Sequence, residues 1–305
     1  MSGNVLTLIA AKPGPQVETW AATASRALEK LGAHLASTVW LAPKLACDII
    51  FDGLDPEQAE AASRNALAKA PVDLIAQGLE GRKKRLLLAD MESTIIANEM
   101  LDEIAGLAGI KPKIAGITRR AMNGEIDFTG ALKERVALLK DRPAGLLEKA
   151  GKRIRVNPGA KELVATMRAH GATTALVSGG FRFYTARIRK ELDFDLDFAN
   201  ELILVGGKIA GTVKEPVRAG NSKLETLTSL AAEHGCPLAS TLAVGDGAND
   251  LPMLGAAGLG IAFHGKPHVV AQARHRVDHA DLTALLYAQG YRREEFAAAP
   301  KRGKK

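Results

Sequence analysis

The sequence predicts an α/β fold: a parallel sheet with a helical cap inserted after its first strand, preceded by a smaller N-terminal α+β domain. Three observations support this prediction. An apolar run over residues 86–89 ends on Asp90, which is typical of a buried strand. Residues 95–153 have helical patterns throughout. After residue 160, short apolar runs alternate with amphipathic helical segments, as in α/β domains.

Residues 1–80 are predicted to form a domain of their own. The expected elements are strands at 5–11, 35–41, 46–51 and 72–76 and helices at 16–31 and 56–69. This β-α-β-β-α-β order is the split βαβ pattern. It resembles the element order of ACT-like modules, which bind amino acids. A packing or dimerisation module, which would make the protein a homodimer, is the alternative interpretation.

Residues 81–290 are predicted to form the α/β domain, joined to the first by a charged linker over 77–84. Its helical cap, about 95–153, should be broken at Gly109–Pro112, at Asn123-Gly124 and at Pro143. Beyond the cap we expect strands at 173–178, 242–245 and 260–263, a hairpin over 202–213, and helices at 161–170, 183–192, 223–234 and 251–257. The basic segment 291–305 is predicted to be a disordered tail.

Composition excludes several classes of protein. The net charge is +7 over 305 residues, and Lys301, Arg302, Lys304 and Lys305 contribute four of these charges, so the basicity does not indicate nucleic-acid binding. Two cysteines, far apart in sequence, form neither a metal motif nor a disulfide framework. No stretch has the pattern of an export signal or of a membrane span, so we expect a cytoplasmic protein without membrane contact.

Acidic residues gather where two of the predicted strands end. Asp90 and Glu92 follow one strand, and their carboxyls could act as a nucleophile and a proton-transfer group or hold a divalent metal. Asp246 lies between two glycines after another strand, with Asn249 and Asp250 close behind. A helix N-cap alone would not need so many polar groups. Carboxylates crowded at one sheet edge would repel each other unless a cation such as Mg²⁺ lay among them.

Other residues could neutralise an anion at the same edge. Ser178-Gly179-Gly180 offers a hydroxyl and backbone N–H groups at a strand-to-helix turn, which suits phosphate oxygens. Lys223 begins a predicted helix after Asn221-Ser222. Taken singly, the first could be an ordinary glycine turn and the second a solvated lysine. The order in which these groups and the acids follow each other along the chain is a more specific indication of function than any one of them.

That order resembles the haloacid dehalogenase-like phosphatases, and within them the phosphoserine phosphatase branch. The resemblance covers about Lys83 to Pro267. Its motifs are Asp90-Met91-Glu92-Ser93-Thr94, Asn98-Glu99, Phe128, Arg135-Val136-Ala137-Leu138-Leu139, Val177-Ser178-Gly179-Gly180-Phe181, Ser222-Lys223 and Val244-Gly245-Asp246-Gly247-Ala248-Asn249-Asp250. The resemblance implies a Rossmann-like sheet with a helical cap, and an extra N-terminal domain like that of many bacterial members.

The resemblance also implies a role for each residue. Asp90 would be the nucleophile and Glu92 the proton donor and base. Mg²⁺ would be held by Asp90, Asp246 and the backbone carbonyl of Glu92. The substrate would be bound by Ser178, Gly179, Lys223 and Asn249 at its phosphate, by Arg135 at its carboxylate and by Glu99 at its ammonium, with Phe128 and Asp250 in supporting positions. The implied reaction is hydrolysis of phosphoserine, the last step of serine biosynthesis.

One position departs from the family pattern, because Glu92 stands where the family usually has aspartate. Some relatives similar to phosphoserine:homoserine phosphotransferases also carry glutamate there. A phosphatase or phosphotransferase acting on another small phosphorylated amino acid, such as phosphohomoserine, is therefore the alternative. A third interpretation is an amino-acid sensor with a vestigial phosphatase domain. The complete set of acids, serine and lysine argues against this interpretation.

Overall fold

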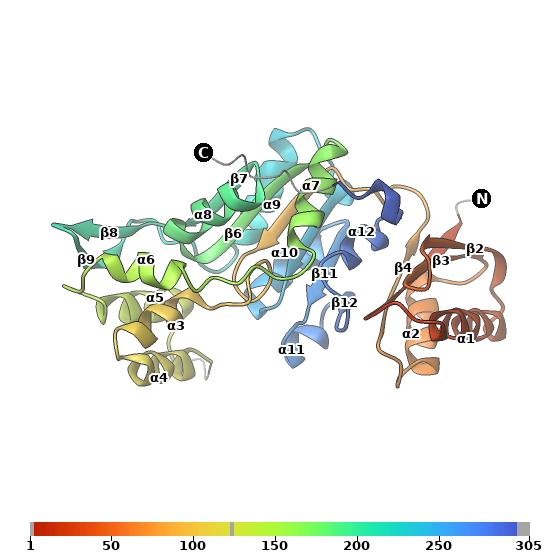
Figure 1. The fold of residues 1–305 in the computed structure, drawn as a ribbon, viewed down its shortest axis with the longest axis horizontal. Coiled ribbons are helices and arrows are strands. Elements are labelled where there is room, and N and C mark those ends of the chain that lie inside the picture. The colour runs from red at the N-terminus through yellow and green to blue at the C-terminus, as the bar shows by residue number, and fades with distance from the viewer. Residues whose placement is uncertain (1–2, 123–124, 298–305) are drawn as a thin grey trace.

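The computed structural model describes residues 3–122 and 125–297 and contains two main sheets. In Figure 1 the helical cap and the N-terminal domain lie on opposite sides of a central six-stranded sheet. Within the described residues, none of the helices combines the length and hydropathy that a membrane crossing requires.

The N-terminal domain is a four-stranded antiparallel sheet with two helices on one face. Its elements are β1 Asn4–Ala10, α1 Gln16–Lys30, β2 His34–Ala42, β3 Ala46–Asp52, α2 Pro56–Ala66 and β4 Val72–Gly78. The strand order is β2-β3-β1-β4, with every neighbouring pair antiparallel. The predicted element order is therefore present, and each element lies close to its predicted range. The likeness to amino-acid-binding ACT modules stays a prediction.

The inner strands of this sheet are buried on both faces. In β1, Leu6 and Leu8 pack with the two helices, whereas Ile9 belongs to the large core of the second domain. Strand β4 packs beside β12, and its Asp73 carboxylate accepts backbone hydrogen bonds from Asp278 (2.7 Å) and Ala280 (2.8 Å). The helix-free face of β1 and β4 is therefore covered by the second domain, whereas most of the edge strand β2 is exposed.

The predicted linker is part of this interface. Arg82 is buried, and its guanidinium donates to Asp48 Oδ2 (2.7 Å), to Thr7 Oγ1 (2.9 Å) and to the backbone oxygen of Ala288 (3.1 Å). Gln77 belongs to β4, and its side chain also donates to Ala288 O at 2.7 Å. The linker predicted over 77–84 is thus packed between the two domains, where tertiary partners satisfy charged and polar groups of Arg82 and Gln77.

The second domain is built on a six-stranded parallel sheet of order β12-β11-β10-β5-β6-β7. The strands are β5 Leu86–Asp90, β6 Thr173–Phe181, β7 Leu196–Asn200, β10 Thr241–Gly245, β11 Leu259–Phe263 and β12 His275–Val277. The helices are α7 Ala160–Ala169, α8 Arg182–Leu192, α9 Ser222–Glu233, α10 Leu251–Ala256, α11 Pro267–Val270 and α12 Ala284–Ala288, with short 3-10 turns at Leu238–Ser240, Ala248–Asp250 and Arg293–Glu295. The α/β fold with a parallel sheet is confirmed.

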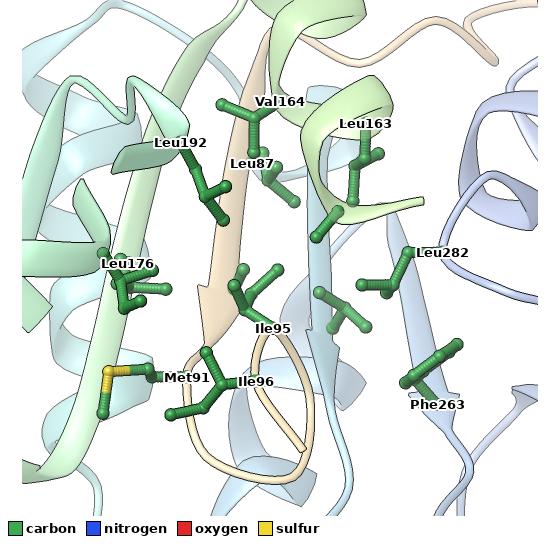
Figure 2. Close-up of a cluster of buried hydrophobic side chains, with 14 of the residues drawn as sticks. Leu87, Met91, Ile95, Ile96, Leu163, Val164, Leu176, Leu192, Phe263 and Leu282 are labelled. Atoms are coloured by element: carbon green, nitrogen blue, oxygen red, sulfur yellow. The ribbon is translucent and has the colours of Figure 1, made fainter. Parts of the chain in front are cut away.

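Alternate residues of the central strand enter two different cores. Leu86 and Leu88 pack with α9 on one face, whereas Leu87 and Ala89 face the larger core. Figure 2 shows Met91, Ile95 and Ile96 turned into the same apolar cluster as Leu87. These anchors hold the chain against the sheet just after Asp90. The cap therefore begins as a packed turn, and the first helix within its predicted range of about 95–153 begins at Met100.

The described residues of the cap form four helices and a hairpin. The helices are α3 Met100–Leu107, α4 Lys111–Met122, α5 Phe128–Ala137 and α6 Gly145–Gly151, and the hairpin is β8 Leu202–Val205 with β9 Lys208–Val213. The hairpin is confirmed, and Gly206 and Gly207 both have the positive φ that its turn requires. Its β9 strand packs against α5, so a segment far along the sequence completes the cap. The predicted break at Asn123-Gly124 lies outside the described residues.

The start of the predicted tail is folded. Tyr291 is buried, the ring of Phe296 packs 5.0 Å from that of Tyr287, and Glu295 forms an ion pair with Lys83 at 2.7 Å. Residues 291–297 are therefore part of the second domain, and the prediction of disorder from residue 291 was wrong. Two aromatic residues of this segment explain the difference, because Tyr291 is buried in the core and the partly buried Phe296 packs against it. Residues 298–305 lie outside the described range.

Candidate active site

The three polar strand ends meet at one edge of the parallel sheet. Strand β5 lies between β10 and β6, with Ala89 opposite Val244 and Asp90 opposite Val177. Asp90 therefore ends β5 beside Ser178 in β6 and Asp246 directly after β10. This convergence follows from the parallel topology, because the carboxyl ends of such strands share an edge.

A buried lysine joins two of the acids. Lys223 Nζ lies 2.5 Å from Asp90 Oδ1 and 2.6 Å from Asp250 Oδ1, and all three side chains are buried. Burial raises the pKa of Asp90, and the Lys223 ammonium opposes that rise. Burial lowers the pKa of Lys223, but the two carboxylates outweigh it and raise that pKa overall. The ammonium therefore stays charged beside the proposed nucleophile.

Oxygen donors for a divalent cation lie on the same edge. One carboxylate oxygen from each of Asp90, Asp246 and Asp250 falls within 4.8 Å of the others. Asp250 is already engaged, since its Oδ2 accepts from the backbone N–H of Gly247 (2.9 Å) and its Oδ1 contacts Lys223. Asp90 and Asp246 stay the predicted metal ligands, and hard carboxylate oxygens suit Mg²⁺.

The Glu92 carboxylate bridges the core and the cap. Its Oε1 accepts from the backbone N–H of Met100, the first residue of α3, at 2.7 Å. Its Oε2 accepts from Ser178 Oγ at 3.0 Å. Desolvation, and secondly the charge of Glu99, raise the pKa of Glu92 to about 7. A carboxyl with this pKa can both donate and accept a proton near neutral pH. Its backbone carbonyl remains the predicted metal ligand.

Two glycines allow side chains to approach the strand end closely. A Cβ atom on Gly179 would lie 2.7 Å from Phe128 Cζ of the cap, and one on Gly180 would lie 2.6 Å from Glu92 Oε2. The Gly180 N–H also donates to Ser178 Oγ at 2.8 Å. The contact between Phe128 and Gly179 shows that the cap lies directly over this edge.

The cap contributes charges of both signs to the same pocket. Glu99 stands at the N-cap position of α3, and its carboxylate accepts from Ser93 Oγ at 2.8 Å. Arg135 lies in the last turn of α5, where its Nε donates to the Ala131 carbonyl at 3.0 Å. Desolvation raises the pKa of Glu99, and the Ser93 hydrogen bond opposes the rise. An anionic and a cationic group are thus available above Asp90.

All the predicted site residues converge. The pocket is lined by Asp90, Glu92, Glu99, Phe128, Arg135, Gly179, Asp246 and Asn249, together with Leu101, Gly180, Phe181 and Lys266. Ser178, Lys223 and Asp250 lie behind this lining and contact it as described above.

Lys266 was missed by sequence reasoning. Its Nζ lies 3.3 Å from Asp246 Oδ2, and its chain follows β11 through His264 and Gly265. The strand ending at Phe263 was predicted. Polar residues just after the other parallel strands were taken as candidate site residues, and the same criterion applied to this strand would have indicated Lys266.

Comparison with known proteins agrees with this arrangement. A family model described as haloacid dehalogenase-like hydrolase matches residues 87–255. A Streptomyces coelicolor protein named phosphoserine phosphatase is 38% identical over 288 residues, which cover 92% of this chain and 70% of that protein. The chain spans 54% and 62% of two other bacterial relatives of that name, so these relatives are longer.

Solved structures are similar over most of the chain. A haloacid dehalogenase family hydrolase from Salmonella enterica serovar Typhi has a TM-score of 0.83 at 28% identity, covering 94% of this chain and 98% of that one. A phosphoserine phosphatase described as a phospho-aspartyl intermediate analogue has a TM-score of 0.63 at 42% identity, covering 67% of this chain and 98% of its own.

Proposed function

The chain belongs to the haloacid dehalogenase-like hydrolases, and from that premise we propose that it hydrolyses O-phospho-L-serine to L-serine and phosphate through an aspartyl-phosphate. The observation that carries the proposal is a single pocket in which Glu99 and Arg135 of the cap face Asp90 of the core. The names of the relatives support the substrate, and the described phospho-aspartyl analogue supports the intermediate. The reaction would complete serine biosynthesis.

In the first step, a carboxylate oxygen of Asp90 forms a bond to phosphorus while the bond from phosphorus to the serine oxygen breaks. Glu92 gives its proton to the departing serine oxygen. In the second step, Glu92 takes a proton from water as the water oxygen attacks phosphorus, and phosphate leaves Asp90. A pKa of about 7 suits Glu92 to both transfers.

Four groups would bind the phosphoryl oxygens. Ser178, the backbone N–H of Gly179 and the Lys223 ammonium lie beside Asp90, and Asn249 lines the same pocket. Charge and N–H donors that are already in place stabilise the developing negative charge without reorganisation. Lys223 would also keep Asp90 oriented, since the two are in contact at 2.5 Å.

The carboxylate cluster of Asp90, Asp246 and Asp250 supports a Mg²⁺ site. We propose Asp90, Asp246 and the Glu92 backbone carbonyl as its ligands. When bound, the ion would supply positive charge that neutralises the phosphoryl group. Asp250 would act from behind, since it holds Lys223 and the 246–247 backbone in position.

Substrate choice would rest on the cap. Arg135 can pair with a carboxylate through two N–H groups, and Glu99 can pair with an ammonium. Phe128 would close the pocket over the strand end, since it touches Gly179. An amino-acid phosphate satisfies both charged groups, whereas a simple sugar phosphate satisfies neither.

Asp90→Asn tests the nucleophile. We expect phosphoserine hydrolysis to be abolished with an unchanged circular dichroism spectrum, because an amide cannot form the acyl phosphate. The matched control is Asp141→Asn, an exposed aspartate of the cap. Turnover retained in the Asp90 variant would remove the assignment.

Arg135→Ala tests substrate choice. The kcat/KM for phosphoserine should fall far more than that for an aryl phosphate without a carboxylate, while Arg119→Ala on the exposed face of α4 changes neither. Equal losses on the two substrates would show that Arg135 does not bind the carboxylate. Phosphohomoserine as substrate, and homoserine as acceptor, belong in the same panel because Glu92 departs from the family pattern.

A further inference from the structure

Lys266 is held in the pocket by its backbone as well as by its charge. Its N–H donates to the Asp246 carbonyl at 3.1 Å, and its own carbonyl accepts from Val269 (2.8 Å) and Val270 (3.0 Å). These bonds tie the turn after β11 to the end of β10. The ammonium then reaches Asp246 Oδ2 at 3.3 Å. The position of this cation beside the predicted metal ligand is therefore built into the fold.

The two lysines of the site differ in how tightly they are bound. Lys223 is 5% exposed and contacts two carboxylates, so it is a fixed part of the acidic edge. The Lys266 side chain is 53% exposed and touches Asp246 alone among the ion pairs of the described residues. A half-exposed lysine on a flexible stem can leave its partner at little cost, because water takes over its solvation.

We propose that Lys266 is a built-in counter-ion that occupies Asp246 when no metal is bound and is displaced when a divalent cation binds. The inference rests on the proposed function for the presence of a cation at Asp90 and Asp246. A metal ion and the Lys266 ammonium carry charge of the same sign and compete for one carboxylate. Lys266 therefore stabilises the metal-free protein and weakens metal binding. It is a positioning residue, since it acts through Asp246.

The sign of this effect separates it from a merely structural role. If Lys266 served only to orient Asp246, removing it would weaken metal binding. A competing cation predicts the opposite, because Asp246 is released when the cation is removed. Repulsion at a half-exposed site is modest, so we expect a change of roughly three- to tenfold in the dissociation constant, which is about 0.7 to 1.4 kcal/mol.

The experiment compares Lys266→Met with Lys266→Arg and with Lys214→Met. Lys266→Arg keeps the charge, and Lys214→Met removes an exposed charge from the cap hairpin, where Lys214 pairs with Glu201. Isothermal titration calorimetry of metal-free protein with MgCl₂ gives the dissociation constant, and thermal unfolding gives the stability with and without Mg²⁺. Hydrolysis of phosphoserine is measured on the parent protein in parallel.

Lys266→Met should bind Mg²⁺ about three- to tenfold more tightly, melt at a lower temperature without metal, and gain more stability from saturating Mg²⁺. Both other variants should stay within about twofold of the parent dissociation constant. Unchanged or weaker binding by Lys266→Met, in a parent that binds Mg²⁺ and hydrolyses phosphoserine, would overturn this inference alone. A parent that binds no Mg²⁺ would overturn both the inference and the metal site of the proposed function.

Discussion

Gly180→Ala should damage the enzyme through one specific contact, with the Glu92 carboxylate. The added Cβ would lie 2.6 Å from Glu92 Oε2, which is about 0.8 Å short of the 3.4 Å at which ordinary contact begins. Gly180 does not have a positive φ, so the substitution brings no backbone strain of its own. To make room, Glu92 must move away from Ser178 Oγ, now 3.0 Å away.

The size of the loss follows from that hydrogen bond. A hydrogen bond to a charged group contributes about 1.5 to 3 kcal/mol, so kcat/KM for phosphoserine should fall by roughly ten- to a hundredfold. Glu92→Asp alone should cost a similar factor, because its carboxylate withdraws by about one C–C bond, ~1.5 Å, and cannot reach both Met100 N and Ser178 Oγ.

The double variant is the decisive measurement. In the Glu92→Asp background the carboxylate has already withdrawn further than the clash requires. Gly180→Ala should then cost less than about threefold, a coupling of about 0.7 kcal/mol or more. Residual loss is expected from Ser178 Oγ, which the new Cβ would meet at 3.1 Å. Gly145→Ala, where an added Cβ meets nothing within 4 Å, is the control. If Gly180→Ala costs the same factor in both backgrounds, the Glu92 contact is not the cause.

Three further predictions concern charge. The folded-state pKa of Glu92, about 7, lies above its usual 4.5, so the stability that Glu92 contributes is complete below pH 4.5 and is lost as pH rises through about 7. Glu92→Gln should therefore reduce the fall in melting temperature between pH 5 and 8, and an unchanged fall would contradict the raised pKa of Glu92. Arg82→Met leaves buried Asp48 without its ion-pair partner and should lower the free energy of unfolding in urea by about 3 to 5 kcal/mol. Adding Asp48→Asn should restore part of this loss, whereas a loss under about 1 kcal/mol would show that the ion pair is not desolvated. Chelation by EDTA should abolish phosphoserine hydrolysis and added Mg²⁺ should restore it, whereas full activity in EDTA would argue against a cation at Asp246.

Much of the fold is readable from the sequence because its signals are local. The apolar runs of the N-terminal strands, the glycine pair of the hairpin and the apolar run before Asp90 are each properties of a few neighbouring residues. The missed strands show the limit. Strand β7 contains Asp197, whose buried carboxylate accepts from Thr185 at 2.9 Å, and β12 has only three residues, two of them His275 and Arg276. Polar residues in short strands give no local signal, because their partners come from other elements.

The sequence by itself determined which groups could do the chemistry. Acids, serine and lysine at strand ends must converge once the strands are parallel. Only the tertiary structure decided how these groups are joined. It directs Glu92 to the first N–H of α3, places Lys266 against Asp246, and buries Arg82 between the domains. In each of these contacts the two residues lie in different segments of the fold and come together only when these segments pack. The direction of each side chain therefore depends on all the elements that pack there, and no local pattern in the sequence predicts it.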